Sequence, residues 1–154
     1  MEHKRITSAG FVVELKDGSY LLGKATGHLP PYCFTIFKGQ TEAGETLIDT
    51  AMRELEEESG INVSKDDRLN KHISSAPIFS YGMSQKDVVV FLLVDAEGVL
   101  DNATFVCNSF FRVGDKDLPE ICEYGKFKLE DMANVIFPSQ QGLVEELKRR
   151  KQKK

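Results

Sequence analysis

The chain has 154 residues, of which 41% are apolar and 29% are charged, a size and composition typical of one globular domain with a full core. The longest apolar run, residues 88–94, is too short to cross a bilayer, and we expect a cytoplasmic protein without a membrane segment or secretory signal. The formal net charge is −4 and six positive charges lie in the last seven residues, which leaves −10 on the first 147, so nucleotides or nucleic acid would bind this body only with an intervening cation.

The first half of the chain predicts a hairpin, a short strand and one long helix. Residues 6–15 and the segment YLLGKAT (20–26) flank the turn KDGS, and YCFTIF (32–37) is rich in residues that favour strands. A helix is expected over residues 46–59, followed by a polar connection over 62–71 and an extended segment over 72–81.

The second half predicts mainly strands and ends in a helix. KDVVVFLLVD (86–95) has the strongest β pattern and predicts a buried central strand. The remaining segments predict a strand (103–113), a loop (GDKDLPE, 114–120), a short strand (124–129) and a helix (143–151) whose basic end suits the helix dipole. We therefore expect one α/β (α+β) domain over residues 1–154, with a basic helix end at 148–154.

Cysteine usage agrees with the expected compartment. Cys33, Cys107 and Cys122 are an odd number and form no CxxC pair. The pattern predicts reduced or buried thiols and argues against a disulfide framework or a zinc site.

The helix over residues 46–59 has clear signals at both ends. Thr46 with Asp49 three residues later predicts a capping box. Gly60 followed by the apolar Ile61 predicts a Schellman-type end, with the glycine in the left-handed conformation.

Three glutamates of this helix lie on one side of it. At roughly 100° per residue, Glu54, Glu57 and Glu58 share an arc of about 100°, and Glu58 falls within the apolar stripe. Charge runs on helices usually form a solvated face, but an unpaired carboxylate inside the buried stripe is unfavourable, and only Arg53 is nearby to compensate. A hard divalent cation would resolve this conflict, since Mg²⁺ takes carboxylate oxygen, water and phosphate as ligands. The segment therefore predicts a metal site.

The same segment resembles the Nudix hydrolases, the family of MutT-like pyrophosphohydrolases. Their box is written G-x5-E-x7-R-E-U-x-E-E-x-G-U, with U a bulky aliphatic residue. Its seven fixed letters would match by chance about once in a billion starting positions. Here the box spans 23 of the 154 residues, with every spacing correct, and is formed by Gly39, Glu45, Arg53, Glu54, Leu55, Glu57, Glu58, Gly60 and Ile61.

The resemblance implies a Nudix fold, a mixed β-sheet sandwiched between α-helices. It also implies hydrolysis of a nucleoside diphosphate derivative that depends on Mg²⁺ or Mn²⁺, with more than one ion at the site when substrate is bound. By position, the metal ligands would be Glu54, Glu57, Glu58 and the Gly39 carbonyl. The resemblance further implies that Arg53 orients a carboxylate, that Glu45 supports the loop or the metal network, and that Glu54 and Glu57 act in catalysis.

Further candidates lie outside the box. Relatives commonly recruit one more glutamate as ligand or general base, and LPEICEYGKF offers Glu120, which we favour, and Glu123; either also fits an exposed loop acid. Lys24 and Lys38 lie where a basic residue could contact substrate phosphate, although an exposed lysine at a strand end is an equally simple interpretation.

These residues do not distinguish among the possible substrates. Dinucleoside polyphosphates are placed slightly first, with ADP-ribose or nucleotide sugars and nucleoside triphosphates as the other expected classes. Two alternatives stay open: an RNA 5′-pyrophosphohydrolase or decapping enzyme, and a non-catalytic nucleotide-binding module of the same fold. The basic tail fits RNA or simply a frayed, soluble helix end.

Overall fold

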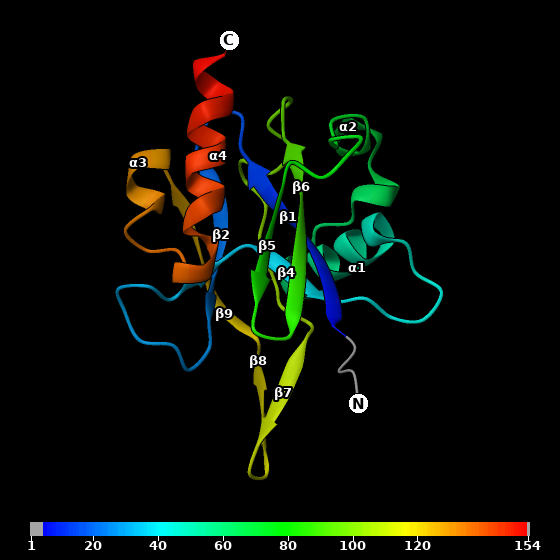
Figure 1. Ribbon diagram of the computed structural model, residues 1–154. Helices are drawn as coiled ribbons and strands as arrows, with labels where there is room; N and C mark the ends of the chain where they lie inside the picture. The colour runs from blue at the N-terminus through cyan, green and yellow to red at the C-terminus, as the bar shows by residue number, and fades with distance from the viewer. Residues whose placement is uncertain (1–4, 154) are drawn as a thin grey trace.

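A seven-stranded mixed sheet forms the centre of the molecule in the computed structural model, which describes residues 5–153 (Figure 1). The strand order is β3-β2-β1-β6-β5, with β4 also paired to β1 and β9 to β2. Strands β1 and β6 run parallel, and the other pairs are antiparallel. The seven strands are β1 (Ile6–Glu14), β2 (Tyr20–Ala25), β3 (Phe34–Thr35), β4 (Phe37–Gln40), β5 (Phe79–Met83), β6 (Lys86–Val94) and β9 (Ile121–Phe127).

Helices cover both faces of the sheet. Figure 1 shows the longest helix, α1, on one side and α3 and α4 on the other. None of the helices within residues 5–153 is long and apolar enough to span a membrane. The bounds are α1 (Leu47–Ser59), α2 (Asp67–Asn70), α3 (Leu129–Met132) and α4 (Gln141–Gln152), with 3-10 turns at Val63–Lys65 and Pro138–Gln140.

Successive side chains of a strand point to opposite faces of the sheet, so the strands contribute apolar side chains to a core on each face, beneath the helices that cover it. On β1, Phe11 packs in the core beneath α1, whereas the next residue, Val12, packs in the core beneath α4. On β6, Phe91 and Val90 divide in the same way. The expected mixed sheet between helices is therefore confirmed, and so is the buried strand β6, which lies between β1 and β5.

A second, two-stranded sheet forms an arm that projects beyond the main sheet (Figure 1). It consists of β7 (Phe110–Val113) and β8 (Lys116–Pro119), joined by a turn in which Gly114 takes a φ of 64°, a conformation that glycine permits in tight hairpin turns. The prediction of a loop over 114–120 was wrong, because four of those residues pair with β7.

The predicted strand over residues 103–113 was too long. Only Phe110–Val113 is a strand, and the residues before it bind the end of α1 instead. The Val106 and Asn108 N–H groups donate to the Ser59 and Glu57 carbonyls at 3.1 and 2.6 Å. These carbonyls belong to the last turn of α1, where intrahelical partners are missing, so the segment satisfies them and lies beside the helix end.

Candidate active site

Both ends of α1 are fixed by local contacts. The Thr46 hydroxyl accepts from the Asp49 N–H at 3.2 Å and the Asp49 carboxylate accepts from the Thr46 N–H, which confirms the capping box. Gly60 has a φ of 83° and its N–H donates to the Glu56 carbonyl. The Ile61 N–H donates to the Ser59 hydroxyl and not to a backbone carbonyl of α1, so the helix ends in the simpler left-handed motif and not in the expected Schellman pattern.

Two of the three glutamates predicted as metal ligands are buried between α1 and β4. The Glu54 and Glu58 residues are 7% and 5% exposed. Glu58 accepts a hydrogen bond from the Lys38 N–H at 2.9 Å. Glu54 lies directly over Gly39, where an added Cβ would stand 2.1 Å from the Glu54 carboxyl carbon. Gly39 is therefore required for this close approach of backbone and carboxylate.

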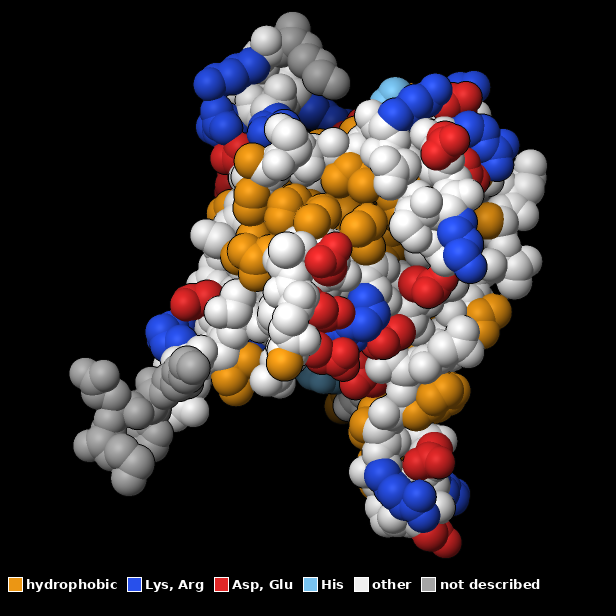
Figure 2. All heavy atoms as spheres, turned by 90° about the vertical axis from the view of Figure 1, so that its right-hand side faces the viewer, with side chains coloured by type: hydrophobic (Ala, Val, Ile, Leu, Met, Phe, Trp, Pro, Cys, Tyr) orange, Lys and Arg blue, Asp and Glu red, His pale blue; other side chains and the backbone are white. Residues whose placement is uncertain are grey.

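Arg53 lies at the centre of an acidic cluster formed by Glu45, Glu54 and Glu57. Its Nε lies 2.6 Å from a Glu45 oxygen, and its Nη1 lies 2.9 Å from Glu54 and 3.2 Å from Glu57. Its Nη2 donates to the Gln40 carbonyl at 2.9 Å. Figure 2 shows such a group of acidic side chains around a basic one on the face toward the viewer. One guanidinium thus joins the loop before α1 to the carboxylates on the helix.

The acidic side chains divide into two electrostatic groups. Burial, and then the neighbouring Glu54 carboxylate, raise the pKa of Glu58 well above its ordinary value. Burial and the Glu57 charge also raise the pKa of Glu54, although Arg53 opposes the shift. By contrast, hydrogen bonds from Arg53 and from the Glu42 N–H lower the pKa of Glu45 to about 2. Glu54 and Glu58 are consequently the side chains that gain most from an added cation.

These shifts predict a pH-dependent stability. Glu54 and Glu58 bind protons more tightly in the folded chain than in the unfolded chain, so in EDTA the free energy of unfolding should fall as the pH rises from 4.5 through their raised values. Glu45 changes the free energy of unfolding only at lower pH than this range, since its pKa is lowered. Urea denaturation between about pH 5 and about pH 7 measures the slope. Glu58→Gln should reduce it, and an unchanged slope would contradict the assignment.

The cluster opens into a hollow of about 580 Å³. Glu120 lies in the wall of this hollow. The Glu120 N–H donates to the Ser109 carbonyl at 2.8 Å, and the Glu120 carbonyl accepts from the Thr26 N–H at 3.0 Å. The hollow is lined by Gly39, Gln40, Thr41, Glu42, Ala43, Arg53, Glu54, Glu57, Ser109 and Glu120.

The other predicted candidates lie apart from this hollow. Glu123 lies opposite Lys24 in the β2–β9 ladder, and neither residue is in the lining. Lys38 contributes its backbone N–H to Glu58, but its side chain is not in the lining either. Ser109 was missed by sequence reasoning, because it reaches the hollow only through the pairing of the preceding segment with the end of α1.

The three glutamates predicted as metal ligands are held by contacts with protein groups. Within residues 5–153, no three His, Cys, Asp or Glu side chains are arranged to hold an ion. Arg53 holds Glu54 and Glu57, and the Lys38 N–H holds Glu58. The donor chemistry nevertheless fits Mg²⁺ or Mn²⁺, since buried and half-buried carboxylate oxygens border an open hollow.

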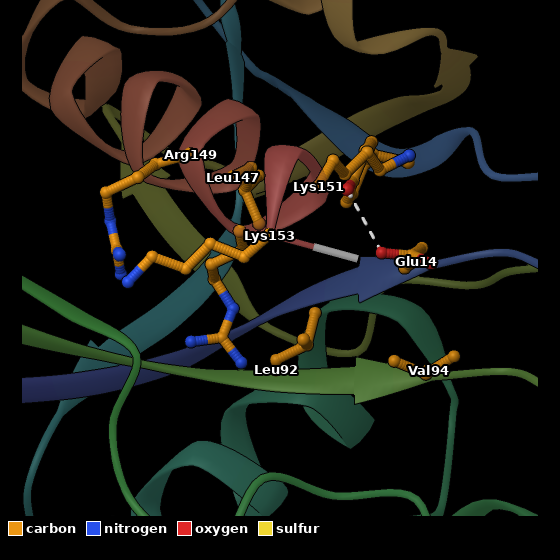
Figure 3. A pocket seen from close by; sticks show the side chains of 9 residues that line it. Glu14, Leu92, Val94, Leu147, Arg149, Lys151 and Lys153 are labelled. Atoms are coloured by element: carbon orange, nitrogen blue, oxygen red, sulfur yellow. Dashed lines mark hydrogen bonds between the residues drawn. The ribbon is translucent and has the colours of Figure 1, made fainter.

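A separate hollow of about 360 Å³ lies at the basic end of α4. Lys154, the last residue of the predicted basic end at 148–154, is outside the described residues. Figure 3 shows Arg149, Lys151 and Lys153 extending around Leu147, with the Tyr20–Glu14 hydrogen bond as a dashed line. Arg149 is paired with Glu146, and the Lys151 ammonium lies over the Tyr20 ring. The two hollows have no lining residue in common, so the predicted basic helix end is separate from the acidic cluster.

The molecule thus combines a mixed sheet between helix layers with a carboxylate-lined hollow beside the capped helix α1. Residues 4–144 match the NUDIX domain family, and the chain belongs to this family. It is an enzyme of the Nudix pyrophosphohydrolase class, as its sequence predicts. No curated protein sequence matches the chain significantly.

Solved structures share the fold at low sequence identity. The chain is 20% identical to the C. elegans Ap4A hydrolase, with a TM-score of 0.64 over 97% of this chain and 99% of that one. It is also 20% identical to a MutT structure from work on Aliivibrio salmonicida and Vibrio cholerae, with a TM-score of 0.66 over 96% and 99%. A bifunctional NMN adenylyltransferase/ADP-ribose pyrophosphatase from Francisella tularensis is 14% identical, with a TM-score of 0.67 over 96% of this chain and 42% of that one.

Proposed function

We propose that the protein hydrolyses the pyrophosphate linkage of a nucleoside diphosphate derivative with Mg²⁺ or Mn²⁺. The observation that carries this proposal is the buried Glu54, which borders an open hollow beside the half-buried Glu57 and lies close to a second buried carboxylate, Glu58. A carboxylate with a raised pKa at the wall of a hollow, as Glu54 is here, is typical of functional sites. All fixed residues of the box are present, which favours catalysis over a binding module that has lost it.

In this proposal each residue has a distinct task. Glu54, Glu57 and Glu58, with the Gly39 carbonyl, would hold the ions, which supply positive charge to the phosphate oxygens when bound. Arg53 keeps Glu45 and the loop before α1 in place through its 2.6 Å contact. Glu57 and Glu120 both line the hollow, so either carboxylate can accept the proton of the attacking water.

The proposed substrate is a small nucleotide derivative. Dinucleoside polyphosphates are placed first, in line with the C. elegans Ap4A hydrolase, and ADP-ribose, nucleotide sugars and nucleoside triphosphates follow. Lys24 and Lys38 remain proposed phosphate contacts for the part of the substrate that extends beyond the hollow. We also propose a reducing compartment such as the cytoplasm, since Cys33, Cys107 and Cys122 are all free.

A substrate panel tests the proposal. Ap4A, ADP-ribose, a nucleotide sugar, a nucleoside triphosphate and 5′-triphosphate RNA would each be incubated with Mg²⁺ or Mn²⁺, with EDTA as control, and the products separated by chromatography. We expect turnover of at least one compound, and none in EDTA. Nucleotide binding without turnover of any compound would contradict the proposal and favour a sensor module.

The hollow at the end of α4 favours RNA as a second candidate substrate. Its rim includes Arg150 and Lys153, for which no carboxylate of residues 5–153 lies within 4.0 Å. Phosphate contacts of such side chains release counterions, so RNA binding should weaken steeply as salt is added. A flat salt response in a filter-binding assay would remove this candidate.

A further inference from the structure

The hollow has no surface for a nucleobase. Its lining is polar or small, and the largest apolar side chain in it is that of Ala43. Phosphates and ions suit such a lining, whereas proteins usually bind a base by stacking it on an aromatic side chain. A nucleotide whose phosphates occupy the hollow must therefore place its base beyond the rim.

The arm formed by β7 and β8 begins at that rim. The Glu120 N–H donates to the Ser109 carbonyl at 2.8 Å. This bond extends the β7–β8 ladder by one pair beyond Phe110 and Pro119, on the side away from the turn. Ser109 and Glu120 both line the hollow. Figure 1 shows the arm leading away from the main sheet, and Figure 2 shows hydrophobic side chains at its base, below the acidic cluster.

Strand alternation decides which residues of the arm face the same way as the hollow's wall. Side chains two residues apart share a face, so the pair Phe111 and Leu118 continues the face of Ser109 and Glu120. Phe110, one residue earlier, lies on the opposite face and is 56% exposed. Phe111 is thus the aromatic residue nearest in the ladder to the hollow on the correct face.

Phe111 and Leu118 have no role in the core. Both are partly buried, and neither belongs to the two core clusters of the described residues or packs against them. The residues that join the arm to the main body are nevertheless fixed by hydrogen bonds. The Asn108 N–H donates to the Glu57 carbonyl at 2.6 Å, and the Thr26 N–H donates to the Glu120 carbonyl. Phe111 and Leu118 are therefore an apolar cross-strand pair on a fixed arm, next to a polar hollow, and such an arrangement suits a binding surface.

We propose that Phe111, backed by Leu118, is the platform on which the nucleobase of the substrate stacks, an inference that rests on the proposed hydrolysis of a nucleotide. Stacking tolerates every base, so the platform selects nucleotides over other diphosphates without choosing among the bases. Loss of the ring should weaken nucleotide binding by about tenfold, within the range for aromatic stacking.

The experiment compares Phe111→Ala with the matched control Phe110→Ala, which removes the neighbouring ring from the opposite face. Calorimetry with Mg²⁺ would measure the Kd of α,β-methylene-ADP and of methylenediphosphonate, which has the same bridging group without a nucleoside. We expect Phe111→Ala to weaken only α,β-methylene-ADP, Phe111→Trp to restore it, and Phe110→Ala to change neither. Circular dichroism would verify the fold of each variant.

Equal effects of Phe111→Ala on both ligands, or equal effects of the two alanine variants, would overturn the platform. This failure is distinct from a failure of the proposed function. A wild-type protein that turns over nucleotides while Phe111→Ala binds normally would contradict the platform alone. Binding of α,β-methylene-ADP that depends on Phe111, without turnover of any compound in the panel, would contradict hydrolysis alone.

Discussion

Glu57→Gln is expected to lower kcat by about 10²- to 10⁴-fold, the range for loss of a positioned acid or base, while the fold is retained. Glu57 lines the hollow and has a side chain 38% exposed, so the amide replaces a partly solvated carboxylate. It keeps the shape of the side chain but removes the negative charge that would hold an ion or accept a proton. Turnover of the best substrate from the panel, with Mg²⁺ present, measures the effect.

Glu56→Gln is the matched control for this change. Glu56 is on the same helix, but its side chain is exposed and hydrogen-bonded to the Asn62 amide, outside the lining of the hollow. Both substitutions remove one negative charge from α1, so a general electrostatic effect would act on both. Wild-type kcat in Glu57→Gln, or equal losses in the two variants, would contradict the assigned role.

Gly39→Ala is expected to abolish most activity and to destabilise the fold by about 1–3 kcal/mol, the range for an overpacked interior. The new methyl group would stand 2.1 Å from the carboxyl carbon of Glu54, far inside van der Waals contact. Glu54 would have to leave its place over β4 and lose its 2.9 Å contact with Arg53. Urea denaturation and a turnover assay measure the two effects.

Gly82→Ala provides the comparison for that variant. Gly82 lies in strand β5, where a Cβ would meet its nearest neighbours at 3.4 and 3.5 Å, an ordinary contact distance. We expect wild-type activity and little change in stability. If Gly39→Ala behaved in the same way, the close packing of Glu54 on β4 would not be needed for function.

The features that sequence reasoning predicted correctly depend on local signals. The bounds of α1 follow from Thr46, Asp49 and Gly60, which act within one turn of the helix. The buried position of Glu58 followed from its angle on the helix alone. Strand β6 was predicted because the run VVVFLLV (88–94), rich in valine, is apolar on both faces.

What sequence reasoning missed depends on contacts between distant segments. Strand β8 was predicted as a loop because it is short and lies in the mostly polar segment GDKDLPE (114–120), and its pairing partner was not visible in the pattern. Ser109 reaches the hollow only because Asn108 pairs with Glu57, which is 51 positions earlier in the numbering. The role of Arg53 was underestimated for the same reason, since its contacts with Glu45 and the Gln40 carbonyl depend on how the preceding loop folds over α1.

The central claim is that divalent ions bind among Glu54, Glu57 and Glu58 with phosphate on their other side. Anomalous diffraction from crystals soaked in Mn²⁺ and α,β-methylene-ADP tests this most directly. We predict anomalous peaks between these carboxylates and the phosphate oxygens, with Glu57 released from its 3.2 Å contact with Arg53. The absence of peaks at full Mn²⁺ exposure, with Arg53 still bound to Glu54 and Glu57, would contradict the account.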